Sequence, residues 1–177
     1  MAIPIAARMG LAVATNGSAS NKERVLKLGA TTFIDYRTQR YTDVLHDVDC
    51  VLNTLGEYEL EDEFSVLRRG GHLVSLRGLP NRRFARRANL SPAKRALFGI
   101  AGHRFDRMAA KRGQTYGFLF VHEDGCQLER VGELFPKEQP LAVSLDSTYT
   151  LDRVNEALEH VRSGHSQGKT LLKIEQA

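Results

Sequence analysis

The sequence predicts an α/β fold, a doubly wound sheet of parallel strands joined by crossover helices. The first observation behind this prediction is the alternation of short apolar strands with helical segments along the chain. The second is the position of glycine where helices should end, at Gly29 and at Gly70-Gly71. The third is the length of 177 residues, which suits one globular domain with a buried core.

The elements of the first half each have a local reason. Residues 1–7 read as the middle of a helix. Ser20 and Glu23 have the spacing of a capping box, so a helix is expected from near Asn21, and Gly29 should stop it. The other elements expected here are strands at residues 11–15, up to Asp35-Tyr36, at 49–53 and at 72–76, and a helix at 58–69.

Charge is concentrated in the middle of the chain. Eleven Lys and Arg residues and one acid, Asp106, lie within residues 77–112, a local balance of +10. Such a block could attract nucleic acid or an anionic surface. Its interleaved apolar residues favour amphipathic helices with a solvated basic face, with Leu97, Phe98, Phe105 and Met108 packed against the sheet. Nucleic acid is therefore not an expected partner.

The remaining elements follow this basic segment. We expect strands at residues 117–121 and 169–174, helices at 125–135 and 151–161, and a short extended piece at 142–145.

Composition excludes several classes of protein. No long apolar run and no leader stands out, so a cytoplasmic protein without a membrane partner is expected. Cys50 and Cys126 lack disulfide or metal spacing and should be buried thiols. His122 precedes Cys126 by four residues, but a zinc site needs about four ligands, so no zinc is expected.

Ligands of parallel sheets bind beyond the carboxyl ends of the strands, which places the candidate site. Ser18 and Ser20 follow the strand at residues 11–15, with Lys22 and Arg24 nearby. There is no carboxylate at this strand end that could accept hydrogen bonds from the hydroxyls of a ribose. This pattern favours a phosphorylated dinucleotide. The alternative is that both serines only cap the helix.

Other strand ends supply further candidates. Tyr36 could stack on adenine, or be an ordinary strand-end tyrosine. Gly56 and Gly78 would allow a ligand close to the backbone, although glycine is also the common turn residue. The loop at residues 164–169 brings a cation, Lys169, next to the last strand, or is simply a solvated turn.

These residues carry a resemblance to a known superfamily. The motifs are, in order, Val13-Ala14-Thr15 with Ser18, Asn21 and Leu28-Gly29-Ala30; Phe33-Ile34-Asp35-Tyr36-Arg37; residues 47–56; residues 64–71; and Ser163-Gly164-His165 with Gly168-Lys169. Together they resemble the cofactor-binding half of the medium-chain dehydrogenase/reductase superfamily, in its zinc-independent quinone-oxidoreductase-like branch. The resemblance implies a Rossmann-like domain that binds NADP(H).

The resemblance also implies roles for particular residues. Ser18, Asn21 and Lys22 fall where the family contacts the adenosine 2′-phosphate, and Tyr36 falls in the adenine pocket. In the family, two further segments approach the ribose and nicotinamide of the cofactor through their main chain. Their counterparts here are Thr54, Leu55, Gly56, Phe118, Leu119 and Phe120. His165 replaces a frequent arginine, Asn53 replaces the usual aspartate, and Lys169 completes the cofactor-binding set.

Measured against the family, residues 1–177 read as a partial NAD(P)-binding domain with a basic helical insertion at about 80–113. The N-terminal GroES-like catalytic domain, the first and central strand, and the glycine-rich turn have no counterpart. We therefore expect exposed strand edges at residues 11–15 and 50–53, which a complementing segment or a second copy could cover. The 177 residues alone should have little or no reductase activity.

Two functions of different classes follow. The first is the cofactor-binding domain of an oxidoreductase that transfers hydride from NADPH to a quinone, enone or carbonyl substrate. The second is a non-catalytic remnant or interaction module that keeps the fold and offers its basic surface to an acidic partner.

Overall fold

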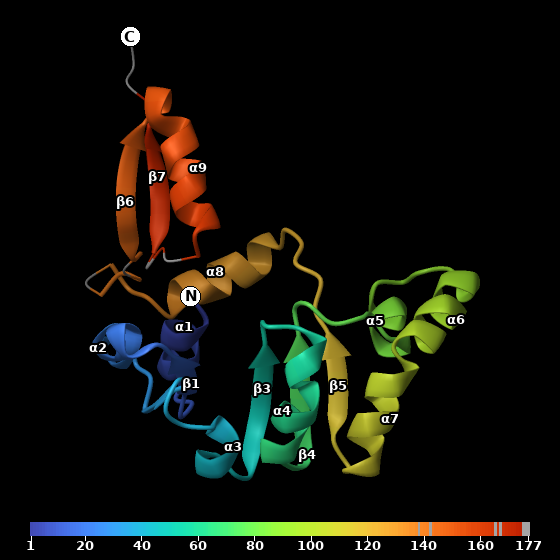
Figure 1. Cartoon of the computed structure of the whole chain (residues 1–177). Coiled ribbons are helices and arrows are strands. Elements are labelled where there is room, and N and C mark those ends of the chain that lie inside the picture. The colour runs from blue at the N-terminus through green and yellow to red at the C-terminus, as the bar shows by residue number, and fades with distance from the viewer. Residues whose placement is uncertain (138, 142, 165, 167, 175–177) are drawn as a thin grey trace. The chain divides into compact units, whose positions relative to one another are not determined.

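The computed structural model describes residues 1–137, 139–141, 143–164, 166 and 168–174 (Figure 1). They form two compact units, one of residues 1–33 with the residues from 124 onward, the other Ile34–Glu123. The strand pairs β3–β4, β4–β5 and β6–β7 are all parallel, and helices separate the strands along the chain. The predicted α/β class is therefore confirmed.

The first unit begins with short elements. These are α1 (Ala2–Arg8), β1 (Ala14–Gly17), the 3₁₀ turn η1 (Ala19–Asn21) and α2 (Lys22–Lys27). Strand β2 (Thr32–Asp35) pairs with β1, and the boundary between the two units falls within it, after Phe33. Strand β1 starts later than the expected 11–15 and takes in Asn16 and Gly17. The capping box is wrong, because η1 intervenes and neither Ser20 nor Asn21 caps α2 through its side chain. Gly29 ends the helix as predicted, with a φ of 102° that favours glycine.

The rest of this unit follows residue 124. It contains α8 (Gly125–Glu133), β6 (Leu145–Thr150), η3 (Leu151–Arg153), α9 (Val154–Arg162) and β7 (Lys169–Lys173). Figure 1 shows α9 alongside the parallel pair β6–β7. The extended piece expected at 142–145 is in fact followed by a six-residue strand. Ala142 itself lies outside the described residues.

The second unit is built on a three-stranded parallel sheet in the order β3-β4-β5. Its first elements are α3 (Tyr41–Val44), β3 (Val48–Asn53), η2 (Glu57–Glu59), α4 (Leu60–Val66) and β4 (Leu67–Ser75), and β5 (Thr115–Phe118) closes the sheet. The helix predicted at 58–69 ends earlier, because β4 already pairs at Leu67 with Val48. Extra residues of β4 then bulge before Cys50 pairs with His72, and Gly70 takes a φ of 82° within that bulge.

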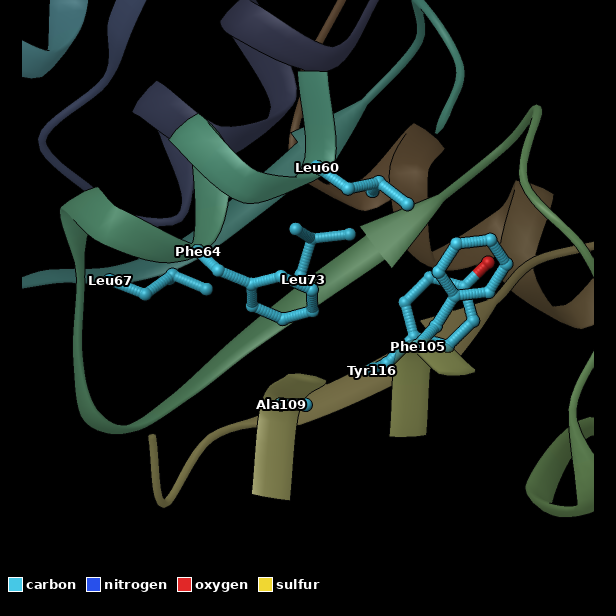
Figure 2. Close-up of a cluster of buried hydrophobic side chains, with 7 residues drawn as sticks. All are labelled: Leu60, Phe64, Leu67, Leu73, Phe105, Ala109 and Tyr116. Atoms are coloured by element: carbon cyan, nitrogen blue, oxygen red, sulfur yellow. The ribbon is translucent and has the colours of Figure 1, made fainter. Parts of the chain in front are cut away.

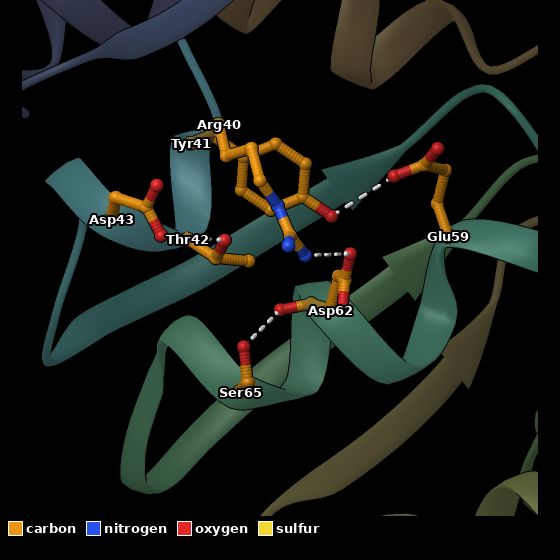
Figure 3. A network of polar contacts seen from close by, with 7 residues as sticks. All are labelled: Arg40, Tyr41, Thr42, Asp43, Glu59, Asp62 and Ser65. Carbon is orange, nitrogen blue, oxygen red and sulfur yellow. Dashed lines mark hydrogen bonds and ion pairs between the residues drawn. The ribbon is translucent and has the colours of Figure 1, made fainter.

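Polar contacts also hold helix α3 against helix α4 (Figure 3). Tyr41 donates its hydroxyl to Glu59 at 3.0 Å, and Arg40 reaches Asp62 at 3.4 Å. Burial and the neighbouring Glu59 carboxylate raise the pKa of Tyr41. The tyrosine therefore stays a neutral donor at physiological pH.

One apolar cluster fills the space between the sheet and its helices (Figure 2). Its members come from α4, β4, α7 and β5: Leu60, Phe64, Leu67, Leu73, Phe105, Ala109 and Tyr116. The rings of Phe105 and Tyr116 lie 5.1 Å apart between centroids. Burying such aromatic rings provides a large share of the stability of this unit.

The basic segment forms three helices, α5 (Arg82–Arg87), α6 (Pro92–Ala101) and α7 (His103–Lys111). Phe105 is buried in the core and Met108 packs against it, as predicted. Phe98 instead packs edge-on against Phe84, with 6.0 Å between ring centroids. The prediction for Leu97 is wrong, because its side chain is 61% exposed.

The expected exposure of the strand edges is found in part. Strand β3 lies at one end of its sheet, so one of its edges has no strand partner within the described part of the chain. Cys50 and Leu52 on this strand are exposed, whereas Asn53 is buried. Cys126 is exposed as well, so the prediction of two buried thiols is wrong.

Candidate cofactor site

The carboxyl ends of β3, β4 and β5 are in register. Asn53 pairs with Ser75, and Ser75 pairs with Phe118. The segments that follow each strand therefore leave the sheet at the same edge. Two of the predicted groups, residues 54–56 and 118–120, are brought together there by this register. The Leu119 amide stays tied to this edge by donating to the Ser75 carbonyl at 3.0 Å.

A buried network of hydrogen bonds holds the loops at this edge of the sheet in place. The Asn53 amide nitrogen donates to both carboxylate oxygens of Glu63, at 2.9 and 2.8 Å, and to the Gly56 carbonyl at 3.0 Å. Its oxygen accepts from the Ser75 hydroxyl at 2.8 Å. Ser75 in turn accepts from the Gly78 amide at 2.8 Å. One asparagine and one serine thus hold the loops that follow both β3 and β4.

The glycines of these loops are required by their geometry. Gly56 has a φ of 115°, which other residues rarely adopt. A Cβ at Gly78 would lie only 2.3 Å from the Tyr116 hydroxyl oxygen and 2.9 Å from that of Ser75. Gly78 is therefore required by packing inside the fold, and Gly56 is required by its backbone conformation.

The electrostatics of this edge follow from burial. Desolvation raises the pKa of Glu63, and the hydrogen bond from Asn53 acts against that rise. Burial raises the pKa of Tyr116 to about 12, and its hydroxyl donates to the Leu79 carbonyl at 2.9 Å. The Asn53 amide also avoids placing a second carboxylate against Glu63.

The segment after β1 is polar and open. Asn21 donates to the Ser18 hydroxyl at 3.1 Å, and Arg24 donates through Nη2 to Asn21 at 2.8 Å. Neither Ser18 nor Ser20 caps a helix through its side chain; their hydroxyls contact each other at 3.0 Å. The interpretation that these serines serve only as caps therefore has no support in the structure.

Two cations border this segment. The Arg24 Nε is buried and has no hydrogen-bond partner within the described residues. Lys22 is exposed and forms no ion pair there, because the neighbouring acid, Glu23, is paired with Lys27 at 2.6 Å. The group thus offers hydroxyl, amide and cationic donors, and the only carboxylate nearby is already paired.

The other predicted residues stand separately. Tyr36 follows β2 and is 58% exposed, with the Arg37 guanidinium over its ring at 5.9 Å. Lys169 begins β7, and its backbone amide donates to the Ser144 carbonyl at 2.8 Å. His165 lies outside the described residues. The structure thus places Tyr36 and Lys169 beside strands without showing a ligand role for them.

Other features of the molecule contribute nothing to this site. A hollow of about 410 Å³ is lined by α1, the end of α2 and residues such as Phe135 and Leu141, and contains none of the predicted residues. Within the described ranges, no three His, Cys, Asp or Glu side chains are arranged to hold a metal ion. No helix among them is long and apolar enough to cross a membrane.

Sequence reasoning missed two residues of these groups, Ser75 and Glu63. Ser75 belongs to a strand, and Glu63 adjoins the helical stripe formed by Leu60 and Phe64. Neither carries a local signal, because their contact with Asn53 depends on strand register. Arg24 was noted as a nearby charge, and its partnerless Nε is visible only in the structure.

This arrangement of parallel strands, crossover helices and loops at the carboxyl strand ends defines the Rossmann-like, cofactor-binding class of oxidoreductase domains. The chain belongs to the zinc-binding dehydrogenase family, whose family model matches residues 28–172. This family is part of the medium-chain dehydrogenase/reductase superfamily, so the resemblance drawn from the motifs is confirmed.

Individual relatives agree with this assignment. "Probable zinc-binding oxidoreductase, mitochondrial" of Arthroderma benhamiae is 26% identical over 159 residues, covering 87% of this chain and 41% of that protein. The synaptic vesicle membrane protein VAT-1 homolog of Danio rerio is 27% identical, covering 89% and 34%. The chain thus spans less than half the length of these two relatives.

Solved structures show the same fold. The quinone oxidoreductase of Coxiella burnetii superposes with a TM-score of 0.75 at 21% identity, covering 98% of this chain and 48% of that one. An alcohol dehydrogenase superfamily protein of Novosphingobium aromaticivorans gives 0.69 at 24% identity, covering 98% and 52%. At such identities the likeness supports the fold alone.

Proposed function

We propose that this chain is the NADP(H)-binding part of an oxidoreductase that reduces a quinone, an enone or a related carbonyl compound. The observation that carries the choice of NADP(H) is the segment after β1. The only carboxylate within residues 16–24, that of Glu23, is paired with Lys27, so none there is free to repel a 2′-phosphate. The Arg24 Nε is buried and has no hydrogen-bond partner within the described residues.

The residues present fit the phosphorylated adenosine end of the cofactor. Ser18, Asn21, Lys22 and Arg24 would bind the 2′-phosphate, because charge-assisted hydrogen bonds to a phosphate are among the strongest in proteins. Tyr36, exposed at the end of β2, would lie against the adenine ring.

The opposite end of the cofactor would use backbone rather than side chains. The loop at Gly56 would approach the cofactor through its backbone, and residues 118–120 leave β5 at the same edge as this loop. When bound, NADPH supplies the hydride, and the protein orients it. His165 and Lys169 complete the proposed set.

The substrate class rests on the family and on the solved relatives. The Coxiella burnetii protein is a quinone oxidoreductase. Because the chain covers less than half of the two curated relatives, the activity is proposed for an enzyme of their full length rather than for the 177 residues alone.

Calorimetric titration of the chain with NADPH and NADH tests the proposal. NADPH should bind more tightly by about tenfold, since one charged hydrogen bond to phosphate is worth about 1.5 kcal/mol or more. Lys22→Gln should reduce this preference. Lys94→Gln is the matched control, because Lys94 is exposed, forms no ion pair within the described residues and lies outside the segment after β1. Equal affinity for both cofactors would contradict the choice of NADP(H).

The second candidate function is a non-catalytic module that keeps the fold. The basic helices α5 to α7 are the observation that favours it, since a local charge of +10 would attract an acidic partner. Absence of binding to either dinucleotide, by a chain whose circular dichroism shows it folded, would favour this candidate.

A further inference from the structure

The exposed face of helix α6 is apolar, although the helix stands in the most basic part of the chain. Leu97 is 61% exposed and Ile100 is 77% exposed. Ala93 and Ala96 are exposed as well, and the spacing of the four residues places them on one face of the helix. The opposite face carries Phe98, which packs on Phe84 of α5. This helix therefore turns its larger aliphatic side chains outward.

Most of the surrounding cations form no side-chain hydrogen bond or ion pair with the part of the chain that the structure describes. Arg95 is used inside the fold, donating to the Leu90 carbonyl at 2.6 Å, while Arg104 pairs with Glu57 and Arg112 lies 3.8 Å from Glu61. The other eight are exposed and form no side-chain hydrogen bond or ion pair within the described residues. They are Arg77, Arg82, Arg83, Arg86, Arg87, Lys94, Arg107 and Lys111.

The single acid of the segment does not neutralise them. Asp106 accepts a hydrogen bond from the Asn81 amide at 2.7 Å, and Asn81 also caps α5 and donates to the Tyr116 carbonyl at 3.2 Å. The carboxylate is thus engaged in holding α5 and α7 to the sheet. The outer surface keeps its positive charge.

An apolar helix face among unpaired cations fits one partner better than the others. A second copy of the chain would bring two surfaces of the same strong charge together. A nucleic acid would neutralise the cations but leave Leu97 and Ile100 against water or phosphate. An anionic lipid surface accommodates both, because the aliphatic side chains enter the boundary between headgroups and acyl chains while the arginines meet the headgroups.

We propose that the α5–α7 segment docks on the surface of anionic phospholipid bilayers, with α6 lying in the plane of the interface. This contact is peripheral, and it requires neither a membrane-spanning helix nor cofactor binding. It replaces the prediction of a merely solvated basic face, which depended on Leu97 being buried.

Co-sedimentation of the full chain with vesicles tests the proposal. Binding to phosphatidylcholine vesicles that contain phosphatidylserine should exceed binding to pure phosphatidylcholine by about tenfold or more, and should fall steeply with salt. Replacing Arg83, Arg86 and Arg87 together by glutamine should abolish the preference for the anionic vesicles.

The apolar part of the contact is tested separately. Leu97→Gln combined with Ile100→Gln leaves the charge unchanged and should lower vesicle binding by about tenfold, since both side chains would lose their place in the interface. Leu128→Gln combined with Leu158→Gln is the matched control, because both leucines are exposed on helices outside the basic segment, by 72% and 62%. The control should bind like the unaltered chain.

Three results would overturn the proposal. The first is equal binding of the Leu97/Ile100 variant and the unaltered chain to anionic vesicles. The second is binding to duplex DNA without binding to the vesicles, which would assign the cations to nucleic acid. The third is a change of oligomeric state in the Leu97/Ile100 variant during analytical ultracentrifugation, which would assign the apolar face to a second copy.

Discussion

Two polar regions of this chain, the strand ends of β3 and β4 and the segment after β1, are built in opposite ways. At the first, Asn53 and Ser75 are fully buried and hydrogen-bonded to Glu63, to each other and to the loop backbone. At the second, the polar groups are exposed or half-buried, and the Arg24 Nε is left without a partner. The first region is thus shaped by folding, and the second has binding capacity unused within the described chain. Substitutions should therefore change stability at the first and ligand affinity at the second.

The largest effect is expected for Asn53→Asp. The change removes a nitrogen that donates to Glu63 and Gly56, and it sets a second buried carboxylate against Glu63. An unpaired buried charge costs about 3–5 kcal/mol, and the free energy of unfolding from urea titration at pH 7 should fall by that amount. Acidification should restore part of the loss, because one proton shared by the two carboxyls relieves their repulsion. An unchanged unfolding midpoint would show that the network does not hold this edge.

A smaller loss of stability is expected for Gly78→Ala. Its methyl group would collide with the Tyr116 and Ser75 hydroxyls, and such overpacking costs about 1–3 kcal/mol. Gly132→Ala is the control, because nothing lies within 4 Å of its Cβ position in α8. That control should instead raise the free energy of unfolding by about 0.5–1 kcal/mol, since alanine favours helix interiors over glycine. Equal effects of the two changes would contradict the close approach seen at Gly78.

In the segment after β1, substitutions should change the affinity for nucleotides rather than the stability of the fold. Arg24→Lys keeps the positive charge but removes the planar guanidinium, which can donate two parallel hydrogen bonds to a phosphate. Binding of adenosine 2′,5′-bisphosphate should therefore weaken by about tenfold, which is about 1.4 kcal/mol. Binding of adenosine 5′-monophosphate, which lacks the 2′-phosphate, should not change. Isothermal calorimetry with both nucleotides checks this. A parallel loss for the two would mean that Arg24 only supports the fold through Asn21.

The smallest effect concerns pH. Because burial raises the pKa of Glu63 above 4.5, the folded state favours the protonated carboxyl. Its contribution to stability is complete below that value and is lost as pH rises through the raised pKa. Glu63→Gln should remove this part of the slope and change the free energy of unfolding at pH 7 by less than about 1 kcal/mol. A slope equal to that of the unaltered chain would assign the pH dependence to other groups.

The contrast between the two regions also explains what the sequence could predict. Local signals were sufficient where one residue decides the outcome, as with Gly29 at the end of α2. They failed at β6, where the segment from Leu145 to Thr150 is mostly polar and is extended only because β7 pairs with it. They also failed at the start of β4, where pairing with β3 stops a helix that periodicity alone would continue.

In the candidate site, too, local features could be predicted from the sequence and contacts between distant residues could not. The position of each predicted residue after a strand could be read from the sequence, because the order of strands and helices determines it. The support beneath them could not, since Glu63 meets Asn53 across ten residues through a particular register of helix and strand. The exposed apolar face of α6, on which the proposed lipid contact depends, could not be predicted for the same reason. Periodicity placed Leu97 among apolar core residues, and only the packing of Phe98 on Phe84 decides which face of α6 is covered.

The two exposed thiols have a practical consequence. The chain has only two cysteines, and Cys50 belongs to one compact unit while Cys126 belongs to the other. Burial and the neighbouring Asp49 raise the pKa of Cys50, which lowers its thiolate fraction and slows its reaction with maleimides. Cys126 can therefore be labelled first with a fluorescent donor and Cys50 second with an acceptor. Without any substitution, energy transfer between the two labels can thus test whether the distance between the two units changes when nucleotide or lipid is added.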